Sequence, residues 1–138
     1  MAGAKQVLIL GGGFGGLTSA NLIRKGLQGE ECEITVVDKN QHFMMGLVNL
    51  WILSGTRRLE DSRVALNKLQ DKGIEFLNDE ITGIDPSENS VTTKTNPNKL
   101  KYDYLVIALG AEIAPKLIDG FEDNTESCFD VYDPKQVS

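Results

Sequence analysis

The sequence contains few of the residues that bind metals or form disulfides. Among its 138 residues are only two cysteines, Cys32 and Cys128, and one histidine, His42. The cysteines lie far apart, and neither belongs to the closely spaced pairs that are typical of zinc sites or redox disulfides. The sequence therefore predicts neither a metal site nor a disulfide framework.

Basic residues are also scarce. The chain has 14 Lys and Arg residues against 20 Asp and Glu, which gives a formal net charge of -6 at pH 7. Proteins that follow the phosphates of DNA or RNA depend on clustered Lys and Arg, so we expect no nucleic-acid partner. A ligand that carries phosphate would have to be held by backbone groups.

Long apolar runs are missing as well. The longest apolar stretch, residues 44–53, is interrupted and is far shorter than the roughly 20 residues that a membrane-spanning helix needs. The amino-terminal residues lack the basic and apolar regions of a signal peptide. We expect a cytoplasmic protein with a single domain over residues 1–138 and one ligand site.

The first forty residues have the pattern of a strand, a helix and a second strand. Residues 7–10 are a continuous apolar run ended by glycine, which is typical of a strand buried on both faces. Residues 15–27 have apolar side chains at helical spacing and basic residues near their end. Residues 34–37 are β-formers, and they complete a parallel βαβ unit.

A glycine-rich loop connects the first strand to the helix. Gly11, Gly13 and Gly16 fit the dinucleotide-binding fingerprint, in which they provide a tight turn, room for a pyrophosphate and close helix packing. Asp38 ends the second strand, where a carboxylate can accept hydrogen bonds from both ribose hydroxyls. A glycine-rich turn without function is the alternative, but this context favours a dinucleotide, and the acidic residue disfavours NADP.

The rest of the chain predicts a second group of strands. A short helix is expected within residues 43–53, a helix at 59–72, a third strand at 74–77, meander strands at 80–84, 90–95 and 100–102, and a doubly buried strand at 105–109. The predicted fold class is α/β, a Rossmann-like parallel sheet with a three-stranded antiparallel β-meander at about residues 80–102.

The fingerprint does not separate NAD from FAD, because both present the same ADP half to the loop. The segment YDYLVIALG, residues 102–110, resembles the second signature of two-dinucleotide flavoproteins, in which such a strand leads from the meander back to the FAD sheet. Leu109 stands where that signature usually has threonine. The change removes a hydroxyl but keeps the strand and the glycine.

Within the pyridine nucleotide-disulfide oxidoreductase superfamily, the chain resembles sulfide:quinone oxidoreductases, flavocytochrome c sulfide dehydrogenases and type II NADH dehydrogenases. The resemblance covers almost the whole chain. The segments that carry it are residues 7–17, 36–39, 55–61, 73–77, 84–86 and 102–110. Disulfide reductases of the glutathione-reductase kind are excluded, because residues 43–53 lack their CxxxxC pair.

This resemblance implies that the cofactor is FAD, and it assigns cofactor-binding residues along the chain. These are Gly11, Gly13, Phe14, Gly15, Gly16, Asp38, Lys39, Gly46, Glu80, Ile81, Ala108, Leu109 and Gly110. It also implies that residues 43–51 lie beside the isoalloxazine ring. For any one of those residues, a place in the apolar core is an equal alternative.

Cys128 is the candidate catalytic residue. In sulfide:quinone oxidoreductases a cysteine at about this place contacts the flavin and takes part in sulfur transfer. A flavin-proximal thiolate could attack the flavin or a sulfur chain. The alternative is a small buried side chain without a redox role.

The resemblance implies the amino-terminal FAD-binding part of an oxidoreductase that passes electrons from a small-molecule donor, sulfide or NADH, to a quinone-type acceptor. Asp133 and Pro134 look like a helix start just before the chain ends, so we expect an inactive fragment of a longer protein. Peripheral membrane attachment would come only from the missing carboxyl-terminal part. The alternatives are the NAD domain of a dehydrogenase and a non-catalytic nucleotide-binding module that forms a homodimer through an exposed edge.

Overall fold

The computed structural model describes residues 3–27, 32–121 and 130–133. The chain divides into two compact units, the first comprising Met1–Phe43 and Ala65–Gly110 and the second Met44–Val64 and Ala111–Ser138. The first unit contains the parallel sheet and the meander. The second contains a short helix and the segment that follows the sheet.

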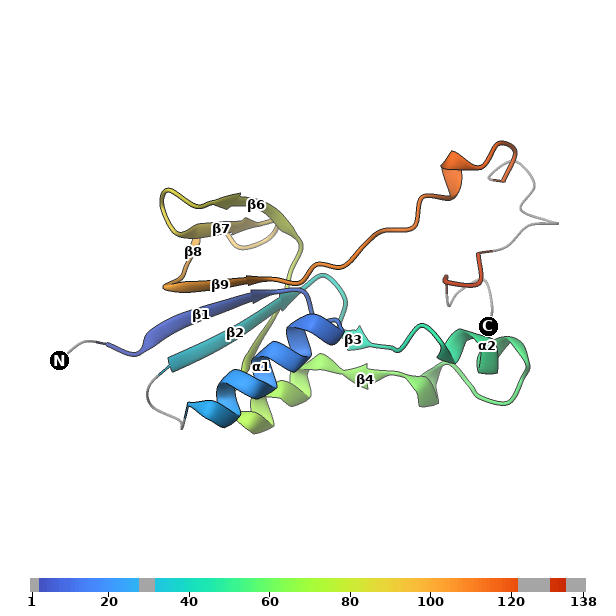
Figure 1. Ribbon diagram of the computed structural model, residues 1–138, viewed down its shortest axis with the longest axis horizontal. Coiled ribbons are helices and arrows are strands. Elements are labelled where there is room, and N and C mark those ends of the chain that lie inside the picture. Colours follow the sequence, from blue (N-terminus) through green and yellow to red (C-terminus); the bar gives the residue numbers. More distant parts are fainter. Residues whose placement is uncertain (1–2, 28–31, 122–129, 134–138) are drawn as a thin grey trace. The chain divides into compact units, whose positions relative to one another are not determined.

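A four-stranded parallel sheet forms the centre of the first unit (Figure 1). In spatial order its strands are β5 (Glu75–Asn78), β2 (Cys32–Asp38), β1 (Lys5–Leu10) and β9 (Tyr104–Ile107). The central strand β1 pairs in parallel with both β2 and β9. Its side chains from Val7 to Leu10 are all buried, as an apolar run between two neighbours predicts.

Helices cover one face of this sheet. The helix α1 (Phe14–Gly26) joins β1 to β2, so the predicted βαβ unit is confirmed. The 3-10 helix η2 (Leu66–Lys72) precedes β5. The buried core on this face consists of Val7, Ile9, Ala20, Cys32, Ile34, Val36, Leu69 and Ile74.

The predicted meander packs on the opposite face and is confirmed (Figure 1). Its antiparallel strands are β6 (Ile81–Asp85), β7 (Ser90–Thr93) and β8 (Leu100–Lys101), in that order. Val91 is fully buried against Leu8, Leu10 and Val37 of the parallel sheet. The meander therefore closes the core on the side away from α1.

The helix predicted at residues 59–72 is wrong as one continuous element. The 3-10 helix η1 (Glu60–Ser62) ends at Arg63, whose backbone is extended, and the two-residue strand β4 (Val64–Ala65) pairs with β3 (His42–Phe43) before η2 begins. The backbone N-H of Leu66 also donates to the carbonyl oxygen of Gln41. Pairing with a distant segment has overridden the local helical pattern.

The strand predicted at residues 105–109 is shorter and more exposed than expected. It ends at Ile107, whose side chain is 61% exposed, and Tyr104 at its start is equally exposed. The prediction of a doubly buried strand is wrong because β9 lies at the edge of the sheet that the described residues form. One side of β9 therefore has no neighbour in the described part of the chain.

The second unit contains the predicted short helix, α2 (Val48–Leu53). Val48 and Ile52 are buried and pack with Met44, Met45 and Leu59. Later in the chain lies the 3-10 helix η3 (Pro115–Leu117). The amide nitrogen of Asn49 donates to the carbonyl oxygen of Val131 at 2.8 Å, which ties the end of the described chain to α2.

Candidate functional site

The glycine loop lies where three strands of the parallel sheet end. The N-H of Gly11 donates to the carbonyl oxygen of Val37 in β2 at 2.8 Å, and Gly11 has a φ of 104°, which favours glycine. A Cβ atom on Gly11 would overlap the carbonyl oxygen of Ala108, just after β9. The loop is therefore fixed between the carboxyl ends of β2 and β9, at the edge where such sheets bind ligands.

Gly13 differs from the other glycines of the fingerprint because the space beside it is open. Apart from Gly13 and its two chain neighbours, no heavy atom of the described residues lies within 4 Å of the position that a Cβ atom on Gly13 would take. Gly13 is also the residue before α1, and in the described chain no side chain caps that helix end and no acidic residue lies in its first turn. Free N-H groups and the helix dipole therefore face an open cradle that fits a pyrophosphate.

The carboxylate of Asp38 contacts this loop directly. One oxygen, Oδ2, accepts a 2.6 Å hydrogen bond from the N-H of Gly12, and the other, Oδ1, accepts one at 2.7 Å from the N-H of Asn40. Each carboxylate oxygen has two lone pairs, so both retain capacity for a ribose hydroxyl. The two bonds fix the carboxylate beside the loop.

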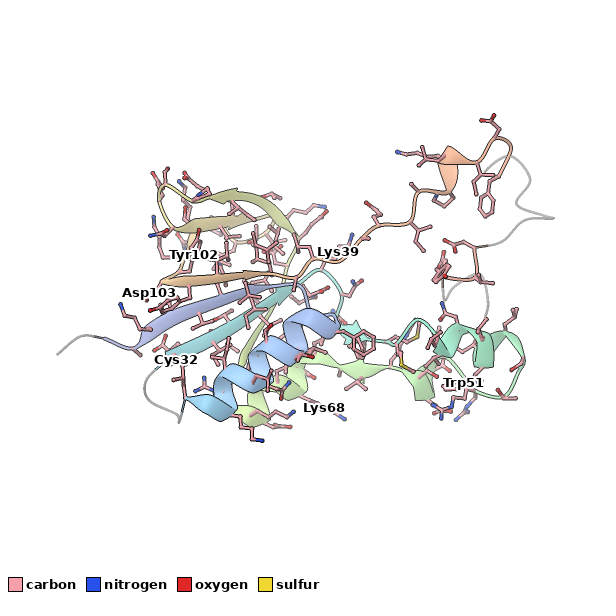
Figure 2. The ribbon with its side chains drawn as sticks, in the orientation of Figure 1. Cys32, Lys39, Trp51, Lys68, Tyr102 and Asp103 are labelled. Atoms are coloured by element: carbon pink, nitrogen blue, oxygen red, sulfur yellow. The ribbon has the colours of Figure 1, made fainter. Side chains whose placement is uncertain are left out.

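Lys39 and Glu80 lie just beyond Asp38, at the carboxyl ends of β2 and β5 (Lys39 is labelled in Figure 2). Glu80 forms a 2.8 Å ion pair with Lys94. The hydrogen bond and charge of Lys94 hold the pKa of Glu80 below its usual range, and the charge of Lys39 adds to this effect. Ile81 begins β6 and packs, half-buried, in the core beneath the meander.

The other predicted residues of the first unit gather around the amino-terminal end of α1. Ala108 donates its N-H to the carbonyl oxygen of Leu10 at 2.8 Å, and a Cβ atom on Gly15 would contact the Ala108 side chain at 3.4 Å. Leu109 is exposed, and Gly110 has a φ of 75°, a left-handed value that favours glycine. Gly15 and Ala108 thus bring α1 and β9 together at the loop.

Phe14 begins α1, and its exposed ring packs edge-on against Phe43, with 5.0 Å between the ring centroids. Gly46 belongs to the second unit, and its assignment to the cofactor stays a prediction. Cys128 lies outside the described residues. Its proposed redox role stays a prediction.

Two residues of this region were not found from the sequence. Gly12 occupies a variable position of the fingerprint, yet a Cβ atom there would lie 2.7 Å from Leu66 Cδ1 and 3.3 Å from the Asp38 side chain. Asp79 is a buried carboxylate, only 5% exposed, next to Glu80. No local sequence pattern identifies Asp79, because Thr95 and Asn96, which donate hydrogen bonds to its carboxylate, lie 16 and 17 residues further along the chain.

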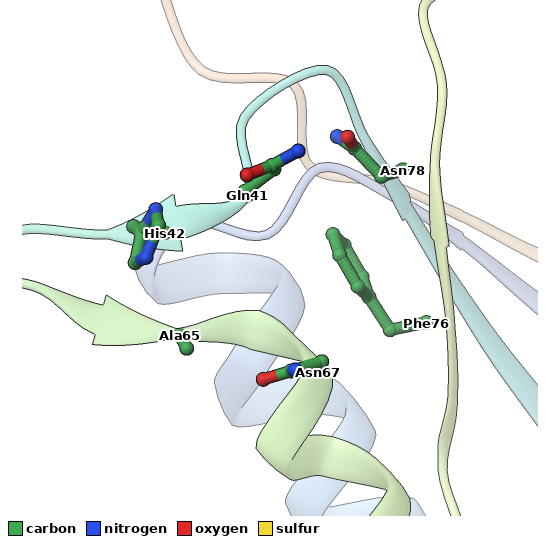
Figure 3. Close-up of a pocket in the computed structure, with 6 residues that line it drawn as sticks. All are labelled: Gln41, His42, Ala65, Asn67, Phe76 and Asn78. Carbon is green, nitrogen blue, oxygen red and sulfur yellow. The ribbon is translucent and has the colours of Figure 1, made fainter.

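A separate pocket of about 350 Å³ opens beside β3 and β5 (Figure 3). Its lining residues are Gln41, His42, Ala65, Asn67, Phe76 and Asn78, none of which the sequence predicted for the cofactor. In the described ranges, no group of His, Cys, Asp and Glu side chains could hold a metal ion. Nor is any helix there long and apolar enough to span a bilayer.

A parallel sheet with the order β5-β2-β1-β9, a glycine loop at its carboxyl edge and an antiparallel meander together define a Rossmann-like α/β domain of the FAD/NAD(P)-binding fold. Residues 5–137 match the family described as pyridine nucleotide-disulphide oxidoreductase. The chain belongs to this family.

Curated relatives and solved structures agree with this assignment. The sulfide-quinone reductase of Aquifex aeolicus (strain VF5) is 38% identical over 125 residues, which are 90% of this chain and 27% of that protein. A type II NADH:quinone oxidoreductase of Staphylococcus haemolyticus (strain JCSC1435) is 32% identical over 120 residues, 86% of this chain and 29% of that protein. The chain therefore spans less than a third of the length of these relatives.

Among solved structures, the sulfide:quinone oxidoreductase of Aquifex aeolicus matches with a TM-score of 0.80 and 35% identity, over 88% of this chain and 28% of that one. The NDH2 of Plasmodium falciparum matches with a TM-score of 0.76 over 97% of this chain and 28% of that one. At 22% identity, this second likeness shows the fold alone.

Proposed function

We propose that this chain is the FAD-binding part of an oxidoreductase that transfers electrons from sulfide or NADH to a quinone-type acceptor. The observation that carries the dinucleotide part of the proposal is the open cradle at Gly13, beside the loop-bound carboxylate of Asp38. The choice of FAD over NAD rests on the antiparallel meander and on β9, the strand that returns from it to the parallel sheet. The choice of donor and acceptor rests on the relatives, which are named as sulfide-quinone and NADH:quinone oxidoreductases.

Each part of the site has a distinct role in this proposal. The N-H groups at the start of α1 hold the pyrophosphate, and Asp38 accepts hydrogen bonds from the ribose hydroxyls. Lys39, Glu80 and Ile81 border the adenosine half of the cofactor. Bound FAD would supply the two-electron chemistry, and the chain's own residues would bind and orient it.

The donor and acceptor sites of the whole protein are proposed to lie mainly outside this chain. The relatives are more than three times as long as the segment that this chain matches. The chain by itself is therefore proposed to bind FAD without turning over donor and acceptor.

Titration of the purified 138-residue chain with FAD and, separately, with NAD tests this proposal. Trp51 is the only tryptophan, so its fluorescence and the flavin fluorescence give two independent signals. We expect FAD to bind with one site per chain and NAD to bind far more weakly. Tighter binding of NAD would indicate the nucleotide domain of a dehydrogenase, and no binding of either ligand would contradict the proposal.

A further inference from the structure

Asp79 lies in the two-residue connection between β5 of the parallel sheet and β6 of the meander. It is buried, although an ionised carboxylate is costly to remove from water unless it is paired or hydrogen-bonded. Its position also makes it the neighbour of Glu80 and Ile81, two of the residues proposed to border the cofactor. A buried charge at this place needs an explanation.

The two oxygens of Asp79 accept hydrogen bonds from the residue before β6 and from the segment between β7 and β8. Oδ1 accepts from the N-H of Glu80 at 2.8 Å and from the N-H of Thr95 at 3.1 Å. Oδ2 accepts from the Thr95 hydroxyl at 2.8 Å and from the N-H groups of Thr95 and Asn96 at 3.2 and 3.1 Å. One side chain therefore joins the start of β6 to the segment that leaves β7.

The backbone of Asp79 contacts the proposed ribose residue on its other side. The N-H of Asp79 donates to the carbonyl oxygen of Asp38 at 3.1 Å. The side-chain amide of Asn78 donates to the same oxygen at 2.9 Å. Asp79 is thus bonded through its backbone to the end of β2 and through its carboxylate to the meander.

The ionisation of Asp79 agrees with these contacts. Burial raises the pKa of its carboxyl group, but the hydroxyl groups of Thr95 and Thr93 and the N-H groups of Glu80 and Thr95 together outweigh burial and hold the pKa well below its usual range. The group is charged at neutral pH. An ionised carboxylate only accepts hydrogen bonds, and here every bond that it accepts comes from a backbone N-H or a hydroxyl.

We propose that Asp79 is a positioning residue that holds the main chain of Glu80 and Ile81 beside Asp38, and so preorganises the part of the site that receives the adenosine half of a dinucleotide. This inference rests on the proposed FAD-binding function. Asp79 acts through the backbone that it fixes. Its loss should weaken ligand binding because the ligand must then order this segment as it binds.

Asp85 provides a matched control in the same meander. Its Oδ1 accepts hydrogen bonds from the N-H groups of Ser87 and Glu88 and from the Ser87 hydroxyl, at the turn between β6 and β7. That turn lies at the opposite end of β6 from Ile81. Asp79→Asn and Asp85→Asn therefore remove the same kind of charged acceptor from the two ends of one strand.

The test measures FAD affinity, ADP affinity and urea unfolding for both variants. We expect Asp79→Asn to weaken FAD and ADP by the same factor, about tenfold, which is the size of one lost hydrogen bond to a charged group. Asp85→Asn should lower stability but leave both affinities within about twofold of the parent. A folded Asp79→Asn chain with parental affinity for both ligands overturns the inference.

A second pair of variants keeps the inference testable if Asp79→Asn does not fold. Thr95→Val removes only the 2.8 Å hydroxyl bond to Asp79, and Thr95→Ser retains the hydroxyl. We expect Thr95→Val to weaken ADP and FAD binding and Thr95→Ser to restore it, and equal affinities for both variants contradict the proposal. If the parent chain binds ADP but shows no preference for FAD, the proposed function fails while the role of Asp79 is still measured with ADP.

Discussion

A Cβ atom on Gly16 would overlap the carbonyl oxygen of Gly11, so the first turn of α1 rests directly on the loop that leaves β1. The atom that would have to move is backbone, at the point where β1, β2 and β9 are joined to the loop. The helix can therefore pack this closely against the loop only because residue 16 is glycine.

Gly16→Ala should destabilise the fold. Forcing a methyl group into this approach should lower the free energy of unfolding by about 1–3 kcal/mol, the usual range for overpacking. Urea denaturation followed by far-UV circular dichroism measures the loss. Gly26→Ala at the other end of α1 is the control, because a Cβ there meets no described atom within 4 Å, and it should be neutral or slightly stabilising. Equal effects of the two changes would contradict the predicted close approach.

Gly13→Ala should weaken FAD binding but leave the stability of the fold nearly unchanged. The backbone of Gly13 is extended, with a φ of -83°, and the space for a Cβ is open, so stability should stay within about 0.5 kcal/mol of the parent. The added methyl group would occupy the cradle proposed for the pyrophosphate. FAD affinity, measured by fluorescence titration, should therefore fall at least about tenfold. Parental affinity in this variant would argue against the placement of the phosphates.

The βαβ unit could be predicted from sequence because its signals are local. The apolar run Val7–Leu10 is buried throughout, Gly11 and Gly16 occupy close approaches to backbone, and Gly13 leaves open space, as the fingerprint spacing implies. The segment at residues 59–72 was mispredicted because the pairing of β4 with β3 depends on contacts outside it. Asp79 was missed for the same reason, because its carboxylate accepts hydrogen bonds from Thr95 and Asn96, which follow β7 in the chain.

Asp38→Asn should weaken both the loop and the proposed cofactor site. Asparagine retains one acceptor oxygen, so either the N-H of Gly12 or that of Asn40 would face an NH₂ group. We expect a loss of about 1–3 kcal/mol in unfolding free energy and a weaker affinity for FAD. Asp71→Asn, a change at an exposed carboxylate in η2, is the control and should alter neither quantity. An Asp38→Asn chain with parental FAD affinity would exclude the proposed ribose contact.

Arg57 lies over the ring of Trp51 in the second unit, with its Cζ atom 4.8 Å from the ring centroid. Arg57→Met should remove a cation-π interaction worth about 0.5–1 kcal/mol at an exposed site. Because Trp51 is the only tryptophan, its emission spectrum reports the change directly. Arg58→Met is the matched control, since Arg58 pairs with Asp61 at 2.8 Å. A shift in emission with Arg58→Met but none with Arg57→Met would refute the assignment.

The stability of the fold should decrease in acid. Hydrogen bonds hold the pKa values of Asp85 and Asp103 below their usual range, and at Asp79 they do so against the opposing effect of burial. A carboxyl group whose pKa is lower in the folded chain than in the unfolded chain stabilises the fold fully at a pH above the unfolded pKa, which is about 4. That contribution disappears as the pH falls through the folded value. Urea midpoints measured between pH 7 and pH 3 should therefore decrease as the pH is lowered. The midpoint of Asp79→Asn should decrease less steeply than that of the parent chain. An identical pH dependence in the two proteins would show that Asp79 does not carry this linkage.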